Sequence, residues 1–457
     1  MAKDAQKTSL VTTYMRLWRG WLAPYWSGLA VSLVLMAITA AAAAGYAKYI
    51  EYIVAGLEAS SSNIIFWGPA GIIALVVIKG VCQYATQVIQ AFALSKMQRD
   101  LQREMYRKMV TMDLSHLMDE APAALAARFS ADMELAKMSC QTVLNALTAI
   151  FTVIAAFIVM VSIDWGLTLG VIAIFLLAFV PVGFIGARVR KISAETQAEI
   201  ADMTANLNEG LSAIRMVRTY QLEDRVLGQA KGLFSRLYKL RVSMVKWQSI
   251  LSPMMEILGG VAIGMLVLLV ALRIQSGAVG LAGFMGLLTA VGIATNPARK
   301  LGYAYTLAQQ GSAALHRIFC MLDVKNLIAE VKDPVSVTQK VKGDIVFEAV
   351  DFTYPDGFKA LHNIDLTLEA GKTYAFVGRS GAGKSTIFNL LPRLFDPSSG
   401  RIFIDGQDIR SVSLADLRSQ ISVVSQESIL LSGSVFENIQ FGRANATKAD
   451  VLSLIHI

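Results

Sequence analysis

Long apolar runs recur through the first two thirds of this chain, and polar segments separate them. A helix needs about 20 consecutive apolar residues to cross the hydrocarbon core of a bilayer. The runs that come near this length are residues 25–47, 64–84, 143–163, 166–189, 250–272 and 279–296. The pattern therefore predicts six membrane-spanning helices.

A shorter segment, residues 7–22, precedes the first span and alternates apolar with polar positions at helical spacing. Its apolar members are Leu10, Tyr14, Leu17, Trp18 and Trp21. Tryptophan prefers the headgroup level of a bilayer, so we expect an amphipathic helix lying in the interface. A cleaved signal peptide is the alternative, but the charged stretch is long for one and further spans follow.

The connections between the spans differ sharply in charge. Those after spans one, three and five are short and poor in Lys and Arg, whereas residues 85–142 and 190–249 are long and basic. The positive-inside rule then places both long loops and both termini in the cytoplasm. Their mixed apolar and charged positions predict that residues 94–112 and 189–211 continue the preceding helices into water. Breaks are expected at 113–122 and near Gly210, with short helices at the loop tips.

The pattern of apolar and polar residues changes after the last span. Residues 299–322 keep a helical pattern and 323–342 are polar, while β-type runs occur from Gly343 onwards. These runs are 345–347, 364–368, 373–377, 402–404 and 421–424. The predicted domains are an interfacial helix (1–24), a transmembrane domain (25–322), a linker (323–342) and part of an α/β domain (343–457).

Composition supports a membrane protein. The chain is 54% hydrophobic and 17% charged, against about 25% charged residues in soluble domains. The net charge of +8 is typical of membrane proteins, which collect Lys and Arg in cytoplasmic loops. No basic run is interleaved with aromatics, so no nucleic-acid partner is expected. The three cysteines lie far apart and form no CxxC or Cys/His group, which argues against a disulfide framework or a zinc site.

One segment fits the phosphate-binding pattern G-x-x-x-x-G-K-[ST]. Its residues are Gly378, Arg379, Ser380, Gly381, Ala382, Gly383, Lys384 and Ser385, followed by Thr386. An apolar run precedes it and a helical run (386–391) follows, a context that a chance glycine-rich turn would lack. Backbone N–H groups of such a loop cradle phosphates, and the helix dipole favours the anion. We expect Lys384 to reach the β- and γ-phosphates of ATP and Ser385 to hold Mg²⁺.

The wider sequence resembles the ABC transporter family. Phe352-Thr-Tyr354-Pro is similar to the family's adenine-stacking loop, which implies that Tyr354 stacks on the base. Val423-Val-Ser-Gln426-Glu resembles the glutamine loop, which implies that Gln426 contacts Mg²⁺ or the attacking water. Lys384 and Gln426 would then be the catalytic residues present.

The membrane half resembles the exporter branch of this family. The similar segments are Glu209-Gly-Leu-Ser-Ala-Ile-Arg-Met-Val-Arg and Gln310-Gly-Ser-Ala-Ala-Leu-His-Arg-Ile-Phe. The resemblance implies a polytopic α-helical membrane domain followed by an incomplete α/β P-loop NTPase domain. It also implies a half-transporter in the cytoplasmic membrane, paired with a second copy of itself or a paralogous half-transporter. The loop tips at 114–119 and 213–220 would dock on the cassettes.

The implied activity is ATP-driven export or flipping of a lipid or an amphipathic compound. A peptide exporter is the nearest alternative, and a regulatory ATP sensor or gated channel that does not pump is the alternative from another class. Surrounding membrane lipids would be partners in each case.

The sequence also departs from the family. No Leu-Ser-Gly-Gly-Gln stretch, no apolar strand ending in Asp-Glu and no switch histidine follows the glutamine loop. The chain as given is therefore expected to bind ATP weakly at best and not to hydrolyse it. Residues 452–457 look like a translated sequencing-adapter end, so we expect a gene model cut short in assembly, with a designed fragment or a natural truncation as alternatives.

Two charged residues, Lys79 and Glu256, fall inside predicted spans. A charge at mid-bilayer costs roughly 2.5–3.5 kcal/mol on insertion scales, so such residues tend to face a cavity or a partner. One interpretation is a charged lining of an inward-facing cavity, in which Lys79 meets an anionic headgroup. The favoured alternative is that Lys79 snorkels to the interface and Glu256 caps or pairs locally.

Overall fold

The computed structural model describes residues 10–118, 122–275, 280–328, 341–379, 381–424, 429–443 and 445–455. These form two compact units. The helical unit is built from residues 7–97 and 136–312. The sheet unit contains residues 98–135 and 313–457.

Six long helices carry the six predicted spans. They are α2 (Trp26–Glu58), α3 (Asn63–Thr111), α6 (Met133–Ile163), α7 (Trp165–Ser212), α9 (Glu223–Gln275) and α10 (Leu281–Leu322). Each predicted span lies within one of these helices except for its first residue in α2 and its first two in α10. Among the described residues, three continuous helical stretches are long and apolar enough to cross a membrane: Leu10–Glu58, Asn63–Thr111 and Ala124–Ile163. The shorter apolar stretch Leu281–Pro297 lies at the start of α10.

The long helices expose apolar side chains on their outer surfaces and bury others where they contact one another. On α3, Ile73, Val76 and Val77 are each more than half exposed, as expected for side chains that face lipid. The inner contacts are made by small and branched residues. One buried cluster joins five helices through Ala47, Met160, Leu167, Val171, Val270, Leu287 and Ala290. Small residues let helix backbones approach closely in a membrane.

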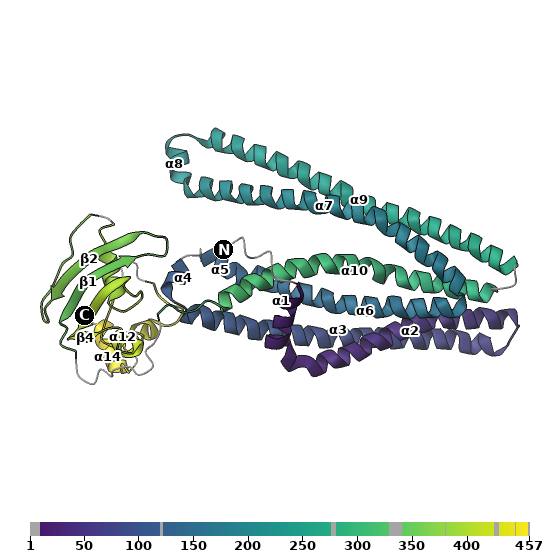
Figure 1. Cartoon of the computed structure of the whole chain (residues 1–457), viewed down its shortest axis with the longest axis horizontal. Helices are drawn as coiled ribbons and strands as arrows, with labels where there is room; N and C mark the ends of the chain where they lie inside the picture. Colours follow the sequence, from purple (N-terminus) through teal and green to yellow (C-terminus); the bar gives the residue numbers. More distant parts are fainter. Residues whose placement is uncertain are drawn as a thin grey trace. The chain divides into compact units, whose positions relative to one another are not determined.

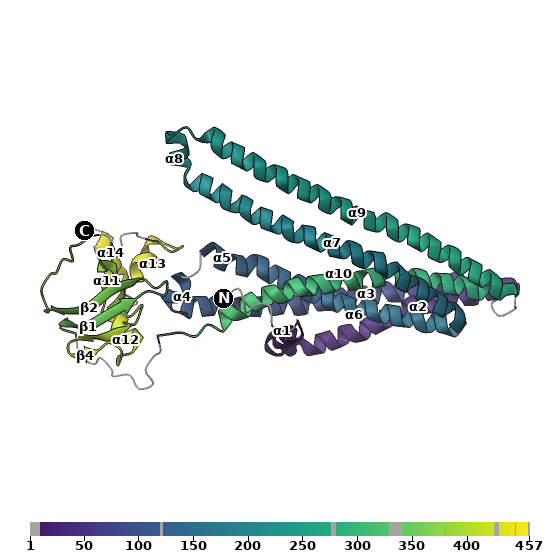
Figure 2. The same ribbon diagram turned by 45° about the horizontal axis from the view of Figure 1, so that its top comes forward.

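The helices also continue beyond the bilayer, as the sequence predicted. Helix α3 has 49 residues, or about 74 Å at a rise of 1.5 Å per residue, against a hydrocarbon core of about 30 Å. Helices α7 and α9 run side by side along much of their length, and the short helix α8 (Ile214–Thr219) connects them at one end (Figure 1). The turned view shows the same pairing (Figure 2).

The break expected near Gly210 is confirmed, three residues further along the chain. Helix α7 continues through Gly210 to Ser212 and ends at Ala213, which leaves the regular helical conformation. A Cβ at Gly210 would lie 3.5 Å from Val226 of the neighbouring α9, an ordinary contact distance. Glycine is therefore tolerated inside this helix, and the chain reverses three residues later.

The sheet unit begins with the tip of the first long loop. It contains α4 (Leu114–Met118), α5 (Pro122–Ala127) and a π-helical turn at Arg128–Asp132. The predicted break between 113 and 122 is confirmed on the described residues. The Arg317 guanidinium near the end of α10 binds the Asp132 carboxylate with two hydrogen bonds of 2.9 and 2.5 Å. This paired geometry fastens the end of α10 to the loop tip.

A four-stranded antiparallel sheet forms the rest of this unit together with short helices. The strands are β1 (Ile345–Thr353), β2 (Lys359–Leu368), β3 (Ser399–Ile404) and β4 (Gln407–Asp408), in the order β2-β1-β3-β4. The helices are α11 (Lys384–Leu390), α12 (Leu414–Ser419), α13 (Val435–Gln440) and α14 (Lys448–Ile455). Buried Phe347, Val350 and Ile402 of the sheet share one core with Ile387 and Leu390 of α11 and Leu417 of α12.

Two predicted strands, 373–377 and 421–424, are not strands in the structure. Neither segment pairs with a strand in the part of the chain that is described. Val377 is 95% exposed and Val424 is 96% exposed. Uniformly apolar runs are typical of strands buried on both faces, which need a partner strand on each side. The described sheet uses other strands and offers these two runs no neighbour.

Candidate functional site

The predicted phosphate loop lies immediately before α11. Gly381 and Gly383 have φ angles of +83° and +82°, a left-handed conformation that L-residues with a Cβ adopt only at a cost. The Ala382 N–H donates to the Arg379 carbonyl at 3.2 Å. The loop therefore makes a tight reversal and enters α11 at Gly383, the residue that precedes its first turn.

Lys384 lies over this loop. Its ammonium donates to the carbonyl oxygens of Gly378 and Arg379 at 2.7 and 2.8 Å. A cation is thus held against the same loop whose N–H groups are expected to bind phosphate. Ser385, the next residue, is exposed, so its hydroxyl is accessible at the first turn of α11.

Tyr354 lies close to the phosphate loop, beside the first turn of α11. Its hydroxyl is 3.0 Å from the hydroxyl of buried Thr386. The ring meets Phe352 and Phe395 nearly edge-on, with centroids 4.8 and 5.6 Å apart. These contacts fix the ring's position and leave it half-buried. Whether it stacks on adenine stays a prediction.

The hairpin that carries Tyr354 is anchored by one carboxylate. Lys359 binds Asp351 at 2.8 Å, and this contact is the largest cause that lowers the pKa of Asp351 to about 2. The Asn363 N–H and the Ser399 hydroxyl also donate to Asp351, at 3.1 and 2.9 Å, and lower its pKa further. The Asp351 carboxylate of β1 therefore connects this strand to β2 and β3 near Tyr354.

The tip of the first long loop also packs on this unit. Leu114, the first residue of α4, contacts the hydrophobic core of the sheet unit. This contact agrees with the prediction that residues 114–119 dock on a cassette. The second predicted docking tip, 213–220, forms α8 of the helical unit, and its docking stays a prediction.

A hydrogen-bonded clasp lies next to Leu114. The Asp113 carboxylate accepts the N–H groups of Leu327 and, at 3.1 Å, of Ile328. The Asn326 amide donates to the Thr111 carbonyl at 2.8 Å. The segment that follows α10 is thereby held against the end of α3 and the start of α4. Sequence analysis missed it. An aspartate before a short helix indicates a helix cap, but here the carboxylate binds a segment 214 residues further along.

We expect Asp113→Asn to release the residues after α10. The neutral amide is a weaker acceptor for two N–H groups than a carboxylate, because bonds to charged groups are roughly twice as strong. Hydrogen exchange at Leu327 and Ile328 should then be roughly tenfold faster, about the effect of losing 1–2 kcal/mol. Asp202→Asn, an exposed aspartate of α7, is the control and should leave exchange there unchanged. Equal protection in both variants would show that the clasp contributes nothing.

Four other predicted site residues do not join this arrangement: two lie outside the described residues, and two lie in the membrane helices. Ser380 and Gln426 lie outside the described residues, so their roles are untested. Lys79 is half-buried and Glu256 is exposed, and no hydrogen bond or ion pair joins the two in the described part of the chain. Nothing in this arrangement separates a cavity lining from snorkelling.

Comparison with known proteins covers both halves of the chain. Residues 25–297 match a family described as ABC transporter transmembrane region, and residues 361–456 match a family described as ABC transporter. Curated relatives include proteins named ATP-dependent lipid A-core flippase. The one from Syntrophus aciditrophicus is 29% identical over 435 residues, covering 94% of this chain and 71% of the relative. The one from Desulfotalea psychrophila is 31% identical over 384 residues, covering 84% and 67%. The one from Chromobacterium violaceum is 26% identical over 453 residues, covering 98% and 77%.

Proposed function

This chain belongs to the ABC transporter family, and from that premise we propose that it uses ATP to flip a lipid across a membrane. The observation that carries the proposal is the tight glycine loop with Lys384 folded over it, in a chain whose apolar helices form the family's transmembrane region. The relatives' name, lipid A-core flippase, supports a large anionic lipid as the substrate class. A peptide exporter has no such support.

We propose that the loop from Gly378 to Thr386 binds the phosphates of ATP. The backbone N–H groups would surround the β-phosphate, and Lys384 would exchange its carbonyl contacts for phosphate oxygens. Tyr354, held by Thr386 and Phe395, would offer its remaining face to adenine. These roles require only small movements, because the ammonium and the ring already lie beside the loop.

The residues present fit a magnesium ion. Mg²⁺ prefers oxygen ligands and is usually bound through one or two side chains together with nucleotide phosphates. The exposed Ser385 hydroxyl meets this need, and the amide oxygen of Gln426 would be the second protein ligand. When bound, the ion neutralises charge on the β- and γ-phosphates.

We propose that two copies, or one copy and a paralogous half-transporter, form the working pump in the cytoplasmic membrane. Closure of the two cassettes on ATP would move α4 through Leu114 and the residues after α10 through the Asp113 clasp. Such coupling requires that ATP bind the closed state more tightly than the open one, because equal affinities shift no population. The basic loops 85–142 and 190–249 support a cytoplasmic location for the cassette.

A flipping assay tests this function. Protein expressed from its own chromosomal locus would be reconstituted in vesicles containing a fluorescent lipid A analogue, and bleaching by dithionite would report the outer-leaflet fraction. ATP should change that fraction with time, and a Lys384→Ala protein should not respond. ATP binding with no lipid movement would favour the non-pumping sensor. Loss of flipping in Lys79→Ala at an unchanged ATPase rate would favour the cavity interpretation over snorkelling.

A further inference from the structure

The N-terminal elbow is a surface formed by residues outside the nucleotide site. It consists of α1 (Leu10–Leu17), a π-helical turn at Trp18–Leu22 and a short 3₁₀ turn at Ala23–Tyr25 that leads into α2. In the π turn the Ala23 N–H donates to the Trp18 carbonyl, five residues back. Such wide turns are rare, and they occur often at functional sites.

One face of the elbow is fixed to the helical unit. Leu17 and Thr13 are buried, and the Tyr14 hydroxyl lies 2.9 Å from the Ser139 hydroxyl and 3.1 Å from the Ala308 carbonyl. The tyrosine thus connects α1 to both α6 and α10. The elbow is therefore a rigid part of the helical unit, and its outward face has a fixed shape.

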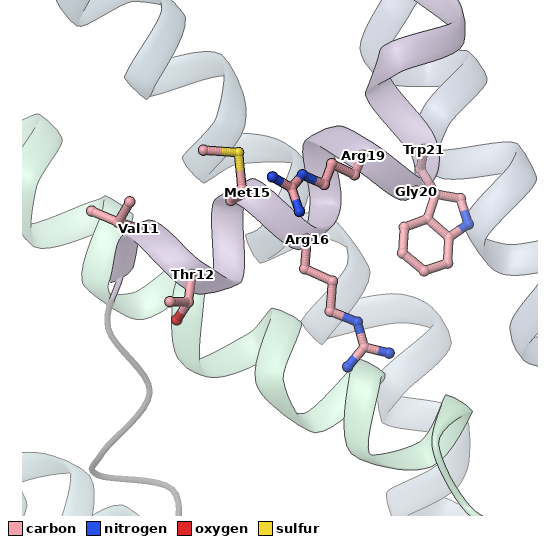
Figure 3. Close-up of a pocket in the computed structure, with 7 residues that line it drawn as sticks. All are labelled: Val11, Thr12, Met15, Arg16, Arg19, Gly20 and Trp21. Carbon is pink, nitrogen blue, oxygen red and sulfur yellow. The ribbon is translucent and has the colours of Figure 1, made fainter.

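The opposite face contains a hollow of about 680 Å³. Val11, Thr12, Met15, Arg16, Arg19, Gly20 and Trp21 line it. Figure 3 shows Met15 and Arg19 along one side of the helix, Arg16 pointing away from Arg19 on the other side, and Trp21 beyond Gly20. The lining holds two guanidinium groups and no acid. Val11 is 68% exposed and Met15 is 46% exposed, so apolar side chains border the charged ones.

We propose that this elbow hollow binds the headgroup of an anionic phospholipid, with Arg19 as its principal contact and Arg16 contributing charge. Guanidinium groups bind phosphate oxygens through paired hydrogen bonds. The flanking Trp18 and Trp26, 41% and 63% exposed, have the amphipathic rings that favour the headgroup level. The exposed Val11 and Met15 would meet the upper acyl chains. An anionic lipid is the ligand class that satisfies both the charge and the apolar border.

Gly20 offers a sharp test of this proposal. Its φ is not in the left-handed region, and a Cβ there would have no atom within 4 Å, so the position accepts a side chain. Gly20→Glu would place a carboxylate in the hollow, while Gly20→Gln adds nearly the same bulk without charge. The pair therefore separates electrostatic repulsion from simple blocking.

The experiment uses the purified chain in neutral detergent, titrated with phosphatidylglycerol or phosphatidylcholine of identical acyl chains. Native mass spectrometry counts the lipids retained. The wild-type chain and Gly20→Gln should retain more phosphatidylglycerol than phosphatidylcholine. Arg19→Gln and Gly20→Glu should each lower phosphatidylglycerol affinity about fivefold, the amount expected from one arginine near an anionic lipid surface. Phosphatidylcholine retention should not change.

Arg241→Gln is the charge control, because this exposed arginine lies on α9, away from the elbow in the sequence. It removes the same charge and should leave lipid retention unchanged. The proposal is overturned if Arg241→Gln lowers phosphatidylglycerol binding as much as Arg19→Gln does, or if Gly20→Gln behaves like Gly20→Glu. Displacement of the lipid by millimolar inorganic phosphate would also overturn it, because the site would then bind a free anion rather than a lipid.

Discussion

Replacing Lys384 by alanine should remove most of the chain's affinity for MgATP. The lysine contributes the only side-chain ammonium in the loop from Gly378 to Thr386, and it is already held there by two carbonyl contacts. Hydrogen bonds to charged groups contribute about 1.5–3 kcal/mol each. Losing one of them to the phosphates should weaken binding by roughly 10-fold to 150-fold, and losing two should weaken it further.

A titration with a fluorescent N-methylanthraniloyl ATP measures this directly on the purified chain. Lys372→Ala is the matched control, because this exposed lysine of the same unit is paired with Glu369 rather than with the loop. The control should bind like the wild type. If Lys384→Ala also retained wild-type affinity, nucleotide would have to bind elsewhere, and the proposed pump would lose its energy source.

The helical part of the molecule could be predicted closely because its signal is local. Residues 64–84 form an apolar run, and the structure places them within α3 (Asn63–Thr111). Length alone requires a helix there, since a bilayer core leaves no other way to satisfy the backbone N–H and C=O groups of a single segment. The mixed pattern of 94–112 likewise predicted that the helix continues beyond the span, and α3 does continue to Thr111.

The sheet could be predicted only in part. An apolar run indicates that a segment is buried, but it does not identify the strand that pairs with that segment. Residues 345–347 and 402–404 are correctly strands, and Ile345 pairs with Ile404 across β1 and β3. The run 373–377 also has a β-type composition, yet it pairs with nothing in the described sheet. Strand formation depends on a neighbour that may lie far away in sequence, so local composition overpredicts it.

The candidate site was likewise predicted where its residues are contiguous and missed where they come from separate segments. The phosphate loop is contiguous, so glycine spacing alone predicted the tight reversal at Gly381 and Gly383 that the structure contains. Contacts between distant segments left no such signal. Neither the Thr386 partner of Tyr354 nor the N–H partners of Asp113 follow from any spacing, because each depends on how separate elements pack.

Gly383→Ala should weaken ATP binding strongly, and Gly381→Ala should be much milder. Both glycines have the same left-handed φ, +82° and +83°, so both variants incur about 1–2 kcal/mol of backbone strain. Their surroundings differ. A Cβ at Gly383 would lie 2.6 Å from the Ala360 carbonyl oxygen and 2.6 Å from Leu361, whereas a Cβ at Gly381 would have no protein atom within 4 Å.

The clash at Gly383 has to be relieved by moving β2 or the start of α11, and overpacking of this kind costs about 1–3 kcal/mol more. ATP affinity should therefore fall roughly 5-fold to 150-fold further in Gly383→Ala than in Gly381→Ala, as measured by the fluorescent titration. Hydrogen exchange should separate the causes: amides around Ala360 and Leu361 should exchange faster in Gly383→Ala only. Equal effects of the two substitutions on both measurements would mean that φ alone matters and that the contact between the loop and β2 does not shape the nucleotide site.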